Sequence, residues 1–355
     1  MLRSLPPIPQ VLSGSLLSRF PATCLQMAAE PCSPGHDGDG ALRSDQERTI
    51  DFNPVHAIKS AAFHIKAGNI NWPMAIYITL AHVWACIGLT YVASVQPKTL
   101  LWALALWPIS LLGIGAGAHR LWSHRSYEAA APVRCFLMLC NSVANQGSIF
   151  HWARNHRVHH THSEKDGDPH NATRGFFFAH IGWLYLRKHP AVITAGKKLS
   201  LDDLHADKFV MFQKACDPWL AMTMCFLMPA AVATLGWGEG FWPALWVAGA
   251  LRYCVCLHFT WLVNSAAHFF GTHPYDSHLQ AAENPLVSLA TIGEGWHNWH
   301  HKYPFDYAVS ELGVTAQFNP TKLFIDGCAR AGLVTNRKRA TGVWERAKLA
   351  RALRD

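Results

Sequence analysis

Four long apolar stretches constrain the fold of this chain more than any other feature. Residues 72–95 and 99–118 contain no charged residue, and residues 219–235 and 241–263 contain only Arg252. An apolar helix of about 20 residues crosses the ~30 Å hydrocarbon core of a bilayer. Short turns at 96–98 and 236–240 join the stretches in pairs. The sequence therefore predicts an all-α integral membrane protein with four transmembrane helices in two hairpins.

The composition supports a membrane protein. Half of the residues are hydrophobic and only 15% are charged, against about 25% in a typical globular protein. The net charge of +8 favours contact with anionic lipid head groups or anionic substrates. No dense run of Lys and Arg occurs, so nucleic acid is not an expected partner. The ten cysteines never form a C-x-x-C pair, and we expect reduced structural thiols with no iron–sulfur or zinc–thiolate site.

The chain divides into three parts by composition. Residues 1–50 are rich in Pro, Ser and Gly, which predicts a disordered or targeting tail. Residues 51–335 form the main domain, and residues 336–355 a basic C-terminal tail. Basic residues concentrate in 119–218 and 264–335, so the positive-inside rule places both parts in the cytosol or stroma. Within the first part, the apolar segment 132–149 is too short for a span and predicts an interfacial or buried helix.

Nine histidines lie in four short clusters between the apolar stretches. The clusters are His119 with His124; His156, His159 and His160; His268, which Asn264 precedes; and His297, His300 and His301. With four spans, every cluster falls on the same side of the membrane. We interpret these clusters as one metal site, held by a helical domain that caps the two hairpins.

The spacing predicts two metal ions. On a helix, positions i+3 and i+4 point about 100° apart, which suits aiming neighbouring histidines at different ions. His119 and His124, five residues apart, would point about 140° apart on a regular α-helix, so one ion would not take both. A zinc ion takes three or four protein ligands, so nine histidines exceed the need of one.

The metal is not identified by the spacing alone. No His-Glu-x-x-His motif occurs, which disfavours a zinc hydrolase, and imidazole binds Fe, Cu, Ni and Zn alike. For isolated histidines in apolar segments, such as His82 and His258, we expect packed or hydrogen-bonded side chains.

The histidine clusters and their flanking residues resemble the membrane fatty acid desaturase family, in its stearoyl-CoA (acyl-CoA delta-9) desaturase branch. The matching segments are 115–124 (GAGAHRLWSH), 152–160 (WARNHRVHH), 168–171 (DPHN), 174–183 (RGFFFAHIGW), 187–190 (RKHP), 264–268 (NSAAH), 295–301 (GWHNWHH) and 317–320 (QFNP). The resemblance covers about residues 70–335 and makes 51–335 a fatty acid desaturase domain.

This resemblance implies a site with two iron ions (Fe2+), which uses O2 and two electrons per turnover. It assigns His119, His160, His268 and His301 to one iron. It assigns His124, His156, His159, His297 and His300 to the other, with Asn264 nearby through a water molecule. No catalytic residue beyond these metal ligands is expected. For the acyl-CoA substrate it implies Asn71, Arg154, Arg187 and Lys188 at the head group and Trp152 and Trp261 along the acyl chain. Asn155 stands where animal relatives commonly have Asp.

The implied activity is insertion of a cis double bond into saturated C16 or C18 acyl-CoA. The alternatives are an acyl-lipid desaturase of a plastid or other membrane, a di-iron hydroxylase and, least favoured, a metal-binding transporter. No His-Pro-Gly-Gly haem signature occurs, so electrons would come from a separate protein, cytochrome b5 with its reductase or, in a plastid, ferredoxin. The implied location is the endoplasmic reticulum membrane with a cytosolic active site, with a plastid membrane as the alternative.

Overall fold

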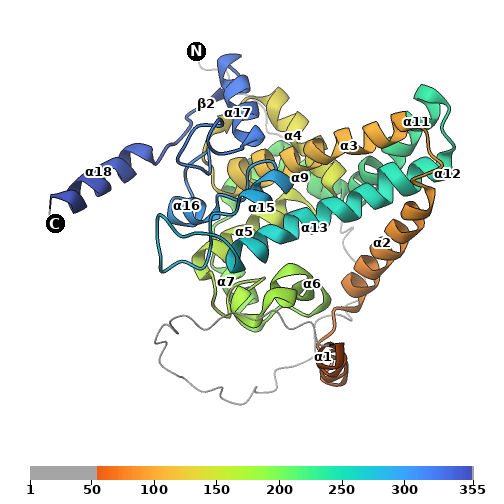
Figure 1. Ribbon diagram of the computed structural model, residues 1–355, viewed down its shortest axis with the longest axis horizontal. Coiled ribbons are helices and arrows are strands. Elements are labelled where there is room, and N and C mark those ends of the chain that lie inside the picture. The colour runs from red at the N-terminus through yellow and green to blue at the C-terminus, as the bar shows by residue number, and fades with distance from the viewer. Residues whose placement is uncertain (1–53, 354–355) are drawn as a thin grey trace, which may run out of the picture. The chain divides into compact units, whose positions relative to one another are not determined.

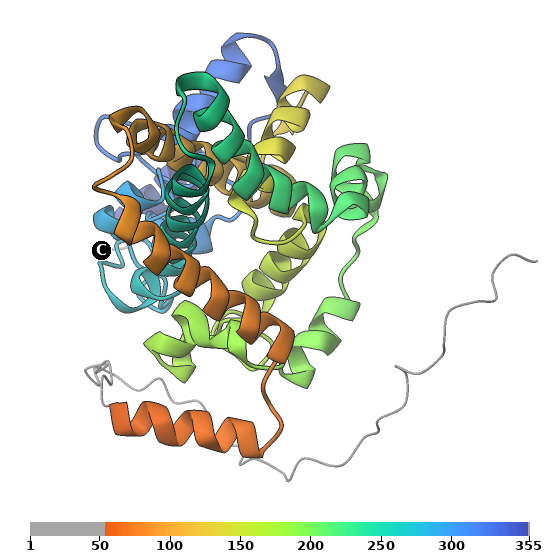
Figure 2. The ribbon, with the colours of Figure 1, turned by 90° about the vertical axis from the view of Figure 1, so that its right-hand side faces the viewer.

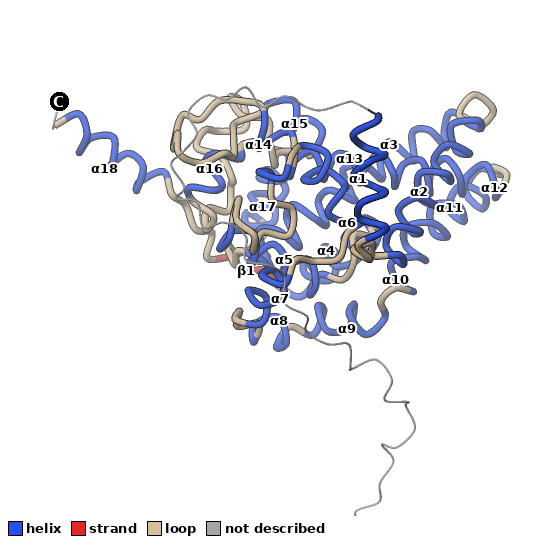
Figure 3. Tube along the Cα trace, turned by 90° about the horizontal axis from the view of Figure 1, so that it is seen from below, coloured by secondary structure: helices blue, strands red, loops and turns tan. Residues whose placement is uncertain are grey.

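The computed structural model describes residues 54–353. The predicted N-terminal tail at 1–50 lies outside the described residues. Within them, helices dominate the chain, as the tube in Figure 3 shows. The structure thus confirms the predicted all-α fold.

Four helices are long and apolar enough to cross a membrane: Trp72–Tyr91, Pro97–Ser123, Trp219–Trp237 and Phe241–Phe269. The first is α2, and the second joins α3 (Pro97–Leu112) to a π-helix, η1 (Gly113–Ser123). The third contains α10 (Trp219–Met222), η4 (Thr223–Leu227) and α11 (Met228–Trp237). The fourth contains α12 (Phe241–Ala244), η5 (Leu245–Leu251), α13 (Arg252–Asn264) and α14 (Ala266–Phe269). The prediction of four spans in two hairpins is confirmed.

Two of the helices extend at least five residues beyond the predicted spans. The second helix continues beyond residue 118 to Ser123, and the fourth continues beyond residue 263 to Phe269. His119 and His268 therefore lie within these helices rather than in the segments that follow them. The helices are longer than the predicted spans because hydropathy ends at the first polar residues, whereas backbone hydrogen bonding continues through them.

The turns of the two hairpins are hydrogen-bonded to each other. The Glu239 carboxylate accepts hydrogen bonds from the Gln96 backbone (2.7 Å) and from the Thr99 hydroxyl (2.6 Å). The Trp237 indole donates to the same hydroxyl at 2.9 Å. These contacts fix the first hairpin against the second at the end opposite the histidines.

Arg252, the one charge predicted within the apolar stretches, is buried with its donors satisfied. Its guanidinium donates to the carbonyls of Ala248 (3.1 Å), Val143 (3.1 Å) and Cys225 (2.7 Å) and to the Ser110 hydroxyl (3.1 Å). A buried charge is tolerated only when it is paired or hydrogen-bonded. Arg252 therefore links α13 to α3, η4 and the helix that contains Val143.

The remaining elements lie outside the four long apolar helices. The helices are α1 (Pro54–Lys66), α4 (Ala131–Ala144), α5 (Ile149–His162), η2 (Ala172–Arg174), η3 (Phe178–Gly182), α6 (Trp183–Tyr185), α7 (Pro190–Lys197), α8 (Asp202–Ala206), α9 (Lys208–Cys216), α15 (Pro285–Ala290), α16 (His297–Lys302), α17 (Pro320–Arg330) and α18 (Thr341–Ala352). Strands β1 (Glu128–Ala129) and β2 (Val334–Thr335) form one short antiparallel pair. The predicted short helix at 132–149 is α4, which ends at Asn145 in a left-handed conformation.

Figure 1 shows α11 and α12 on the right and the histidine-bearing α5 and α16 on the left. Seen from the right-hand side in Figure 2, α2 crosses in front of the other long helices. The stretch 336–355 contains α18, whose Trp344 is buried against Tyr275 and Trp299. Part of the predicted tail therefore packs on the protein.

Candidate metal centre

His119 lies on the π-helix η1, and His124 is the residue directly after it. The sequence of η1, GIGAGAHRLWS, is rich in glycine and alanine. A Cβ at Gly113 would lie 2.1 Å from the backbone nitrogen of Asn141, and one at Gly115 would lie 2.6 Å from Glu294 Oε1. Only glycine permits α4 and Glu294 to approach the helix this closely.

The π-helix places His119 and His124 in the same cluster. The His124 amide donates to the His119 carbonyl, an i to i+5 hydrogen bond of 3.1 Å, and their ring centroids are 4.9 Å apart. The prediction that these two histidines serve different ions was wrong. It assumed α-helical geometry, whereas a π-helical turn brings residues five apart to nearly the same face.

The other histidines lie on α5, α14 and α16. His156 and His160 lie on one face of α5, and His159 points to the side. On α16, His300 and His301 likewise point in different directions. On both α5 and α16, the histidines at i+3 and i+4 therefore point toward different groups, as expected for a helix.

The nine histidines form two adjacent groups. The first contains His119, His124, His156, His160 and His300, and the second contains His159, His268, His297 and His301. Within each group the ligand nitrogens lie within 4.8 Å of one another. The rings of His160 and His301 stack between the groups, with centroids 4.5 Å apart.

The Nε2 atoms point toward common centres. In the first group, His300 Nε2 lies 2.9 Å from the Nε2 atoms of both His119 and His160. In the second, His301 Nε2 lies 3.3 Å from His159 Nε2 and 3.1 Å from His297 Nε2. A neutral imidazole carries only one N–H, so several converging nitrogens are better matched to a cation than to one another.

The predicted division between the two ions was wrong. It combined His119 and His160 with His268 and His301, which the structure separates into different groups. It also combined His124 with His159 and His297. Positions i and i+4 on α5 share a face, so His156 stays with His160 while His159 turns toward α14.

Three carboxylates behind the histidines were missed as functional residues. His119 Nδ1 lies 2.7 Å from Glu294 Oε2, and His159 Nδ1 lies 2.9 Å from Asp168 Oδ1. Glu164 Oε1 lies 3.5 Å from His268 Nδ1. A carboxylate on Nδ1 fixes the ring so that Nε2 faces the metal. The acids at 164, 168 and 294, each within eight residues of a histidine cluster, were the available signal.

Burial keeps six of the cluster imidazoles neutral, and metal binding requires neutral imidazole. Burial and neighbouring histidines hold the pKa of the following residues well below its usual value: His124, His156, His160, His297, His300 and His301. For Glu294, burial raises the pKa, but Arg120 and His119 outweigh it and the pKa falls to about 2. The orienting carboxylate is therefore ionised.

The donor set fits two transition-metal ions. Five and four imidazoles converge in adjacent groups, and imidazole nitrogen suits Fe, Cu, Ni and Zn. Among the described residues, neither group includes a thiolate. The residues present therefore match a redox-active pair such as iron as well as they match zinc.

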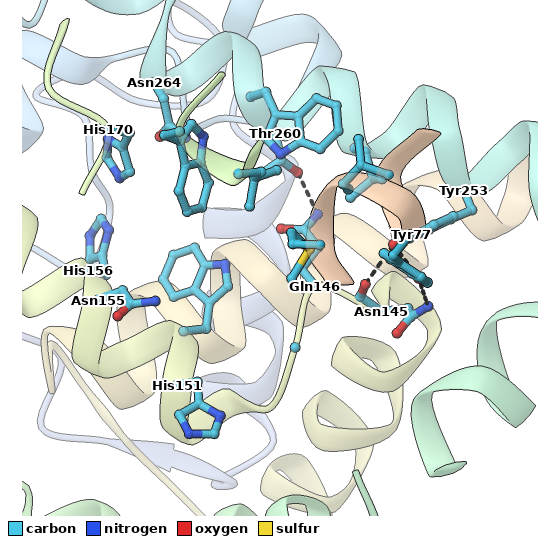
Figure 4. A pocket seen from close by; sticks show the side chains of 18 residues that line it. Tyr77, Asn145, Gln146, His151, Asn155, His156, His170, Tyr253, Thr260 and Asn264 are labelled. Atoms are coloured by element: carbon cyan, nitrogen blue, oxygen red, sulfur yellow. Dashed lines mark hydrogen bonds between the residues drawn. The ribbon is translucent and has the colours of Figure 1, made fainter. Parts of the chain in front are cut away.

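A cavity of about 190 Å³ lies beside the first group. His156, His170 and Asn264 line one end, and Tyr77, Asn145 and Tyr253 line the other, as Figure 4 shows. The predicted chain-lining residues Trp152 and Trp261 both face this cavity. A smaller cavity of about 50 Å³, which also includes Asn264, reaches His119, His159 and His297.

Hydrogen bonds between polar side chains connect separate segments of the cavity wall. Gln146 Nε2 donates to the Thr260 hydroxyl at 2.9 Å. At the far end, the Tyr77 and Tyr253 hydroxyls lie 2.8 Å apart, and Asn145 Nδ2 donates to Tyr77 at 2.8 Å. The cavity therefore ends in a hydrogen-bonded cluster rather than in an apolar surface.

Two of the predicted head-group residues, Arg154 and Lys188, contact a residue of the cavity wall. Lys188 Nζ donates to Asn155 Oδ1 at 2.9 Å, and Arg154 donates to the same oxygen at 3.4 Å. Asn155 itself lines the cavity. Desolvation of the ammonium group and the charge of Arg154 lower the pKa of Lys188 to about 8.

Backbone pairing joins the start of α2 to the segment 185–187. The Asn71 amide donates to the Tyr185 carbonyl at 2.8 Å, and the Arg187 amide donates to the Asn69 carbonyl at 2.8 Å. Asn71 and Arg187 are thus held near each other, although neither lines the cavity.

Comparison with known proteins gives a consistent set of relatives. A family model described as "Fatty acid desaturase" matches residues 93–313. "Stearoyl-CoA desaturase 5" from Bos taurus is 50% identical over 283 residues, which cover 80% of this chain and 84% of that protein. The Homo sapiens protein of the same name is 50% identical over 283 residues, with coverage of 80% and 85%. "Stearoyl-CoA desaturase" from Homo sapiens is 49% identical over 271 residues, with coverage of 76% and 75%.

Proposed function

The chain belongs to the fatty acid desaturase family, and we propose that it is an acyl-CoA delta-9 desaturase. In this proposal, it removes two hydrogens from adjacent carbons of a saturated C16 or C18 acyl-CoA and leaves a cis double bond. The reaction consumes one O2, two electrons and two protons, and it releases two molecules of water.

The observation that supports this proposal most strongly is the position of the cavity. It begins at His156, a member of the first histidine group, and it extends between α2 and α13. An acyl chain in this cavity would bring its methylene carbons close to the metal centre. An unactivated C–H bond needs a strong oxidant, and two iron ions with O2 supply that chemistry when they are bound.

The protein's own residues hold, orient and shield this centre. The nine imidazoles would hold the ions, and Glu294 and Asp168 orient the rings of His119 and His159 through Nδ1. Trp152 stacks on His156, with ring centroids 4.9 Å apart, and covers the centre from the cavity side. Trp152 and Trp261 would exclude water and position the acyl chain.

The basic residues at the mouth would bind the CoA part of the substrate. Arg154 and Lys188 both donate to Asn155, and Arg187 directly precedes Lys188 in the chain. Arginine contacts phosphate through two parallel hydrogen bonds, and lysine acts as a point charge. Asn71, at the start of α2, would add a polar contact.

Electrons would come from a separate protein. For a protein of the endoplasmic reticulum, the donor would be cytochrome b5 with its reductase, and in a plastid it would be ferredoxin. The basic residues concentrate in the segments that carry the histidine groups, which supports a cytosolic or stromal face for these groups. We favour the endoplasmic reticulum with a cytosolic face, because the chain is similar to stearoyl-CoA desaturases.

Expression in yeast that lacks its own desaturase tests the proposal. Gas chromatography of total fatty acids should show cis-delta-9 C16 and C18 products with the wild-type chain. His297→Ala should abolish them, whereas His278→Ala should not, because His278 is exposed and outside both groups. Absence of monounsaturated products with a well-expressed wild-type chain would reject the proposed activity.

A further inference from the structure

A second constellation of metal-ligand side chains lies between α2 and α13, outside the two histidine groups. His82 and Cys86 are four residues apart on α2, and Cys254 and His258 are four residues apart on α13. Residues i and i+4 share one face of a helix. The two helices run in opposite directions, so histidine lies opposite histidine and cysteine lies opposite cysteine.

The side chains of this constellation are close together. His82 Nε2 lies 3.0 Å from His258 Nε2. The donor atoms of His82, Cys254 and His258 lie within 4.8 Å of one another. Cys86 is exposed and lies one turn from His82 on the same face of α2. These donors make a set of two nitrogens and two sulfurs, the composition of many structural zinc sites.

The outer ring nitrogens of the two histidines already have hydrogen-bond partners. His82 Nδ1 lies 2.7 Å from the Ile78 carbonyl. A carbonyl only accepts, so Nδ1 carries the proton of neutral His82 and Nε2 presents a lone pair. His258 Nδ1 lies 3.0 Å from His180 Nε2. Metal-bound histidines typically donate from the outer nitrogen in this way.

The hydrogen bonds beyond His180 favour a lone pair on His258 Nε2 as well. The Ser265 hydroxyl donates to the Trp261 carbonyl at 3.0 Å, so His180 Nδ1 donates to Ser265 Oγ across 2.9 Å. His180 Nε2 then accepts from His258 Nδ1, and His258 Nε2 carries no proton. If His258 Nε2 carried the proton instead, His180 Nδ1 would have to accept from the Ser265 hydroxyl. That hydroxyl would then lose its hydrogen bond to the Trp261 carbonyl.

With this pattern, two lone pairs face each other at 3.0 Å between His82 and His258. They repel unless a cation lies between them. Two nitrogens bound to one tetrahedral zinc ion are about 3.3 Å apart, close to the observed separation.

We propose that His82, Cys86, Cys254 and His258 form a site for a zinc-type divalent cation, separate from the nine-histidine centre. One divalent cation with two thiolates carries no net charge, which suits a position among membrane-spanning helices, where an uncompensated charge is costly. The cysteine spacing alone predicts no zinc–thiolate site. It does not reveal that residues 82 and 86 come close to residues 254 and 258, which are far away in the sequence.

The site would connect the helices that form two walls of the cavity. Tyr77 and Ile78 on α2 and Leu257 and Trp261 on α13 line the cavity. The Trp261 ring lies 6.3 Å from the His82 ring and 5.1 Å from the His258 ring. A bound cation would therefore hold α2 against α13 directly behind Trp261.

Cobalt binding to the iron-loaded full chain tests this site, since a thiolate ligand gives Co2+ an intense charge-transfer absorption. The wild-type chain should bind one Co2+ per chain with this absorption. Cys254→Ser should abolish the absorption, and His180→Ala, which leaves the four ligands intact, should weaken binding about 10–100-fold. Cys328→Ser on α17 is the matched control and should leave the absorption unchanged.

Two results would overturn the proposal. One is the absence of the absorption in the wild-type chain at saturating Co2+, and the other is its persistence in Cys254→Ser. The iron content of each variant reports folding independently. If Cys254→Ser loses its iron, zinc X-ray absorption of the wild-type chain decides: sulfur at about 2.3 Å supports the site, and nitrogen alone rejects it. Neither readout depends on desaturase activity, so this proposal can fail while the proposed function stands.

Discussion

Replacing Glu294 by glutamine tests whether the carboxylates behind the histidines position the metal ligands. Glu294 is buried, and it contacts His119 Nδ1 at 2.7 Å and Arg120 Nη2 at 2.6 Å. Glutamine preserves the shape but removes the charge, and its amide NH2 cannot accept a hydrogen bond from either partner. The remaining carbonyl oxygen accepts from the charged Arg120, which leaves the NH2 facing His119 Nδ1, so His119 loses the contact that fixes its ring.

The expected magnitude has two parts. Loss of a carboxylate that orients a metal-bound histidine typically lowers metal affinity or activity about 10–100-fold. Leaving the buried Arg120 guanidinium without its partner costs about 3–5 kcal/mol of folding free energy. Arg120 keeps its hydrogen bonds to the carbonyls of Tyr307 and Ala308, at 3.1 and 3.2 Å, so we expect the lower end of that range.

Iron affinity by chelator competition separates these two effects. Asp207→Asn is the matched control, because Asp207 is also buried and ion-paired, with Arg134 at 3.0 Å, but contacts none of the nine histidines. We expect both variants to unfold at lower temperature and only Glu294→Gln to lose iron affinity. Wild-type iron affinity in Glu294→Gln, or an equal loss in both variants, would refute the positioning role.

Three further predictions follow from packing and charge. Gly113→Ala should lower the unfolding temperature by the equivalent of about 1–3 kcal/mol, because its Cβ would meet Asn141 N at 2.1 Å; Gly327→Ala, with nothing within 4 Å, should be neutral or slightly stabilising. In the metal-free protein, histidines such as His156 and His300 have lowered pKa values, so below the unfolded pKa of about 6.5 the unfolded state binds more protons than the folded state. The stability of the fold is therefore highest above that pH and is lost as the pH falls below it. An unfolding temperature that stays constant from about pH 7.5 to 5.5 would contradict this. The pKa of Lys188 is about 8, so the KM for acyl-CoA should rise as pH increases from about 7 to 9, and Lys188→Arg should remove that dependence because arginine stays charged.

The sequence was sufficient to predict the membrane helices and the identity of the histidines. Span length and charge predict helices such as α2 with little dependence on the rest of the fold. The histidine spacing also predicts that two ions are bound, because helical geometry separates His159 from His160. These predictions rely on local rules, which the surrounding structure does not change.

The division of ligands between the ions depends on backbone geometry that the sequence does not reveal. The π-helical turn at His119 lies in a segment whose Gly113 packs closely against α4, a contact between separate helices. The role of Glu294 depends on the approach of the segment before α16 to Gly115. The pairing of His82 with His258 depends on the packing of α2 beside α13. In each case, the missing information was a contact distant in sequence.

Conversion of labelled stearoyl-CoA by microsomes from cells expressing this chain tests the central claim most directly. The account predicts cis-delta-9 C18:1 as the labelled product, formed only with O2 and an electron donor and absent with His300→Ala. It also predicts that the product forms on acyl-CoA before transfer to lipid. Labelled hydroxy acid, or a double bond that forms only after incorporation into lipid, would contradict the account.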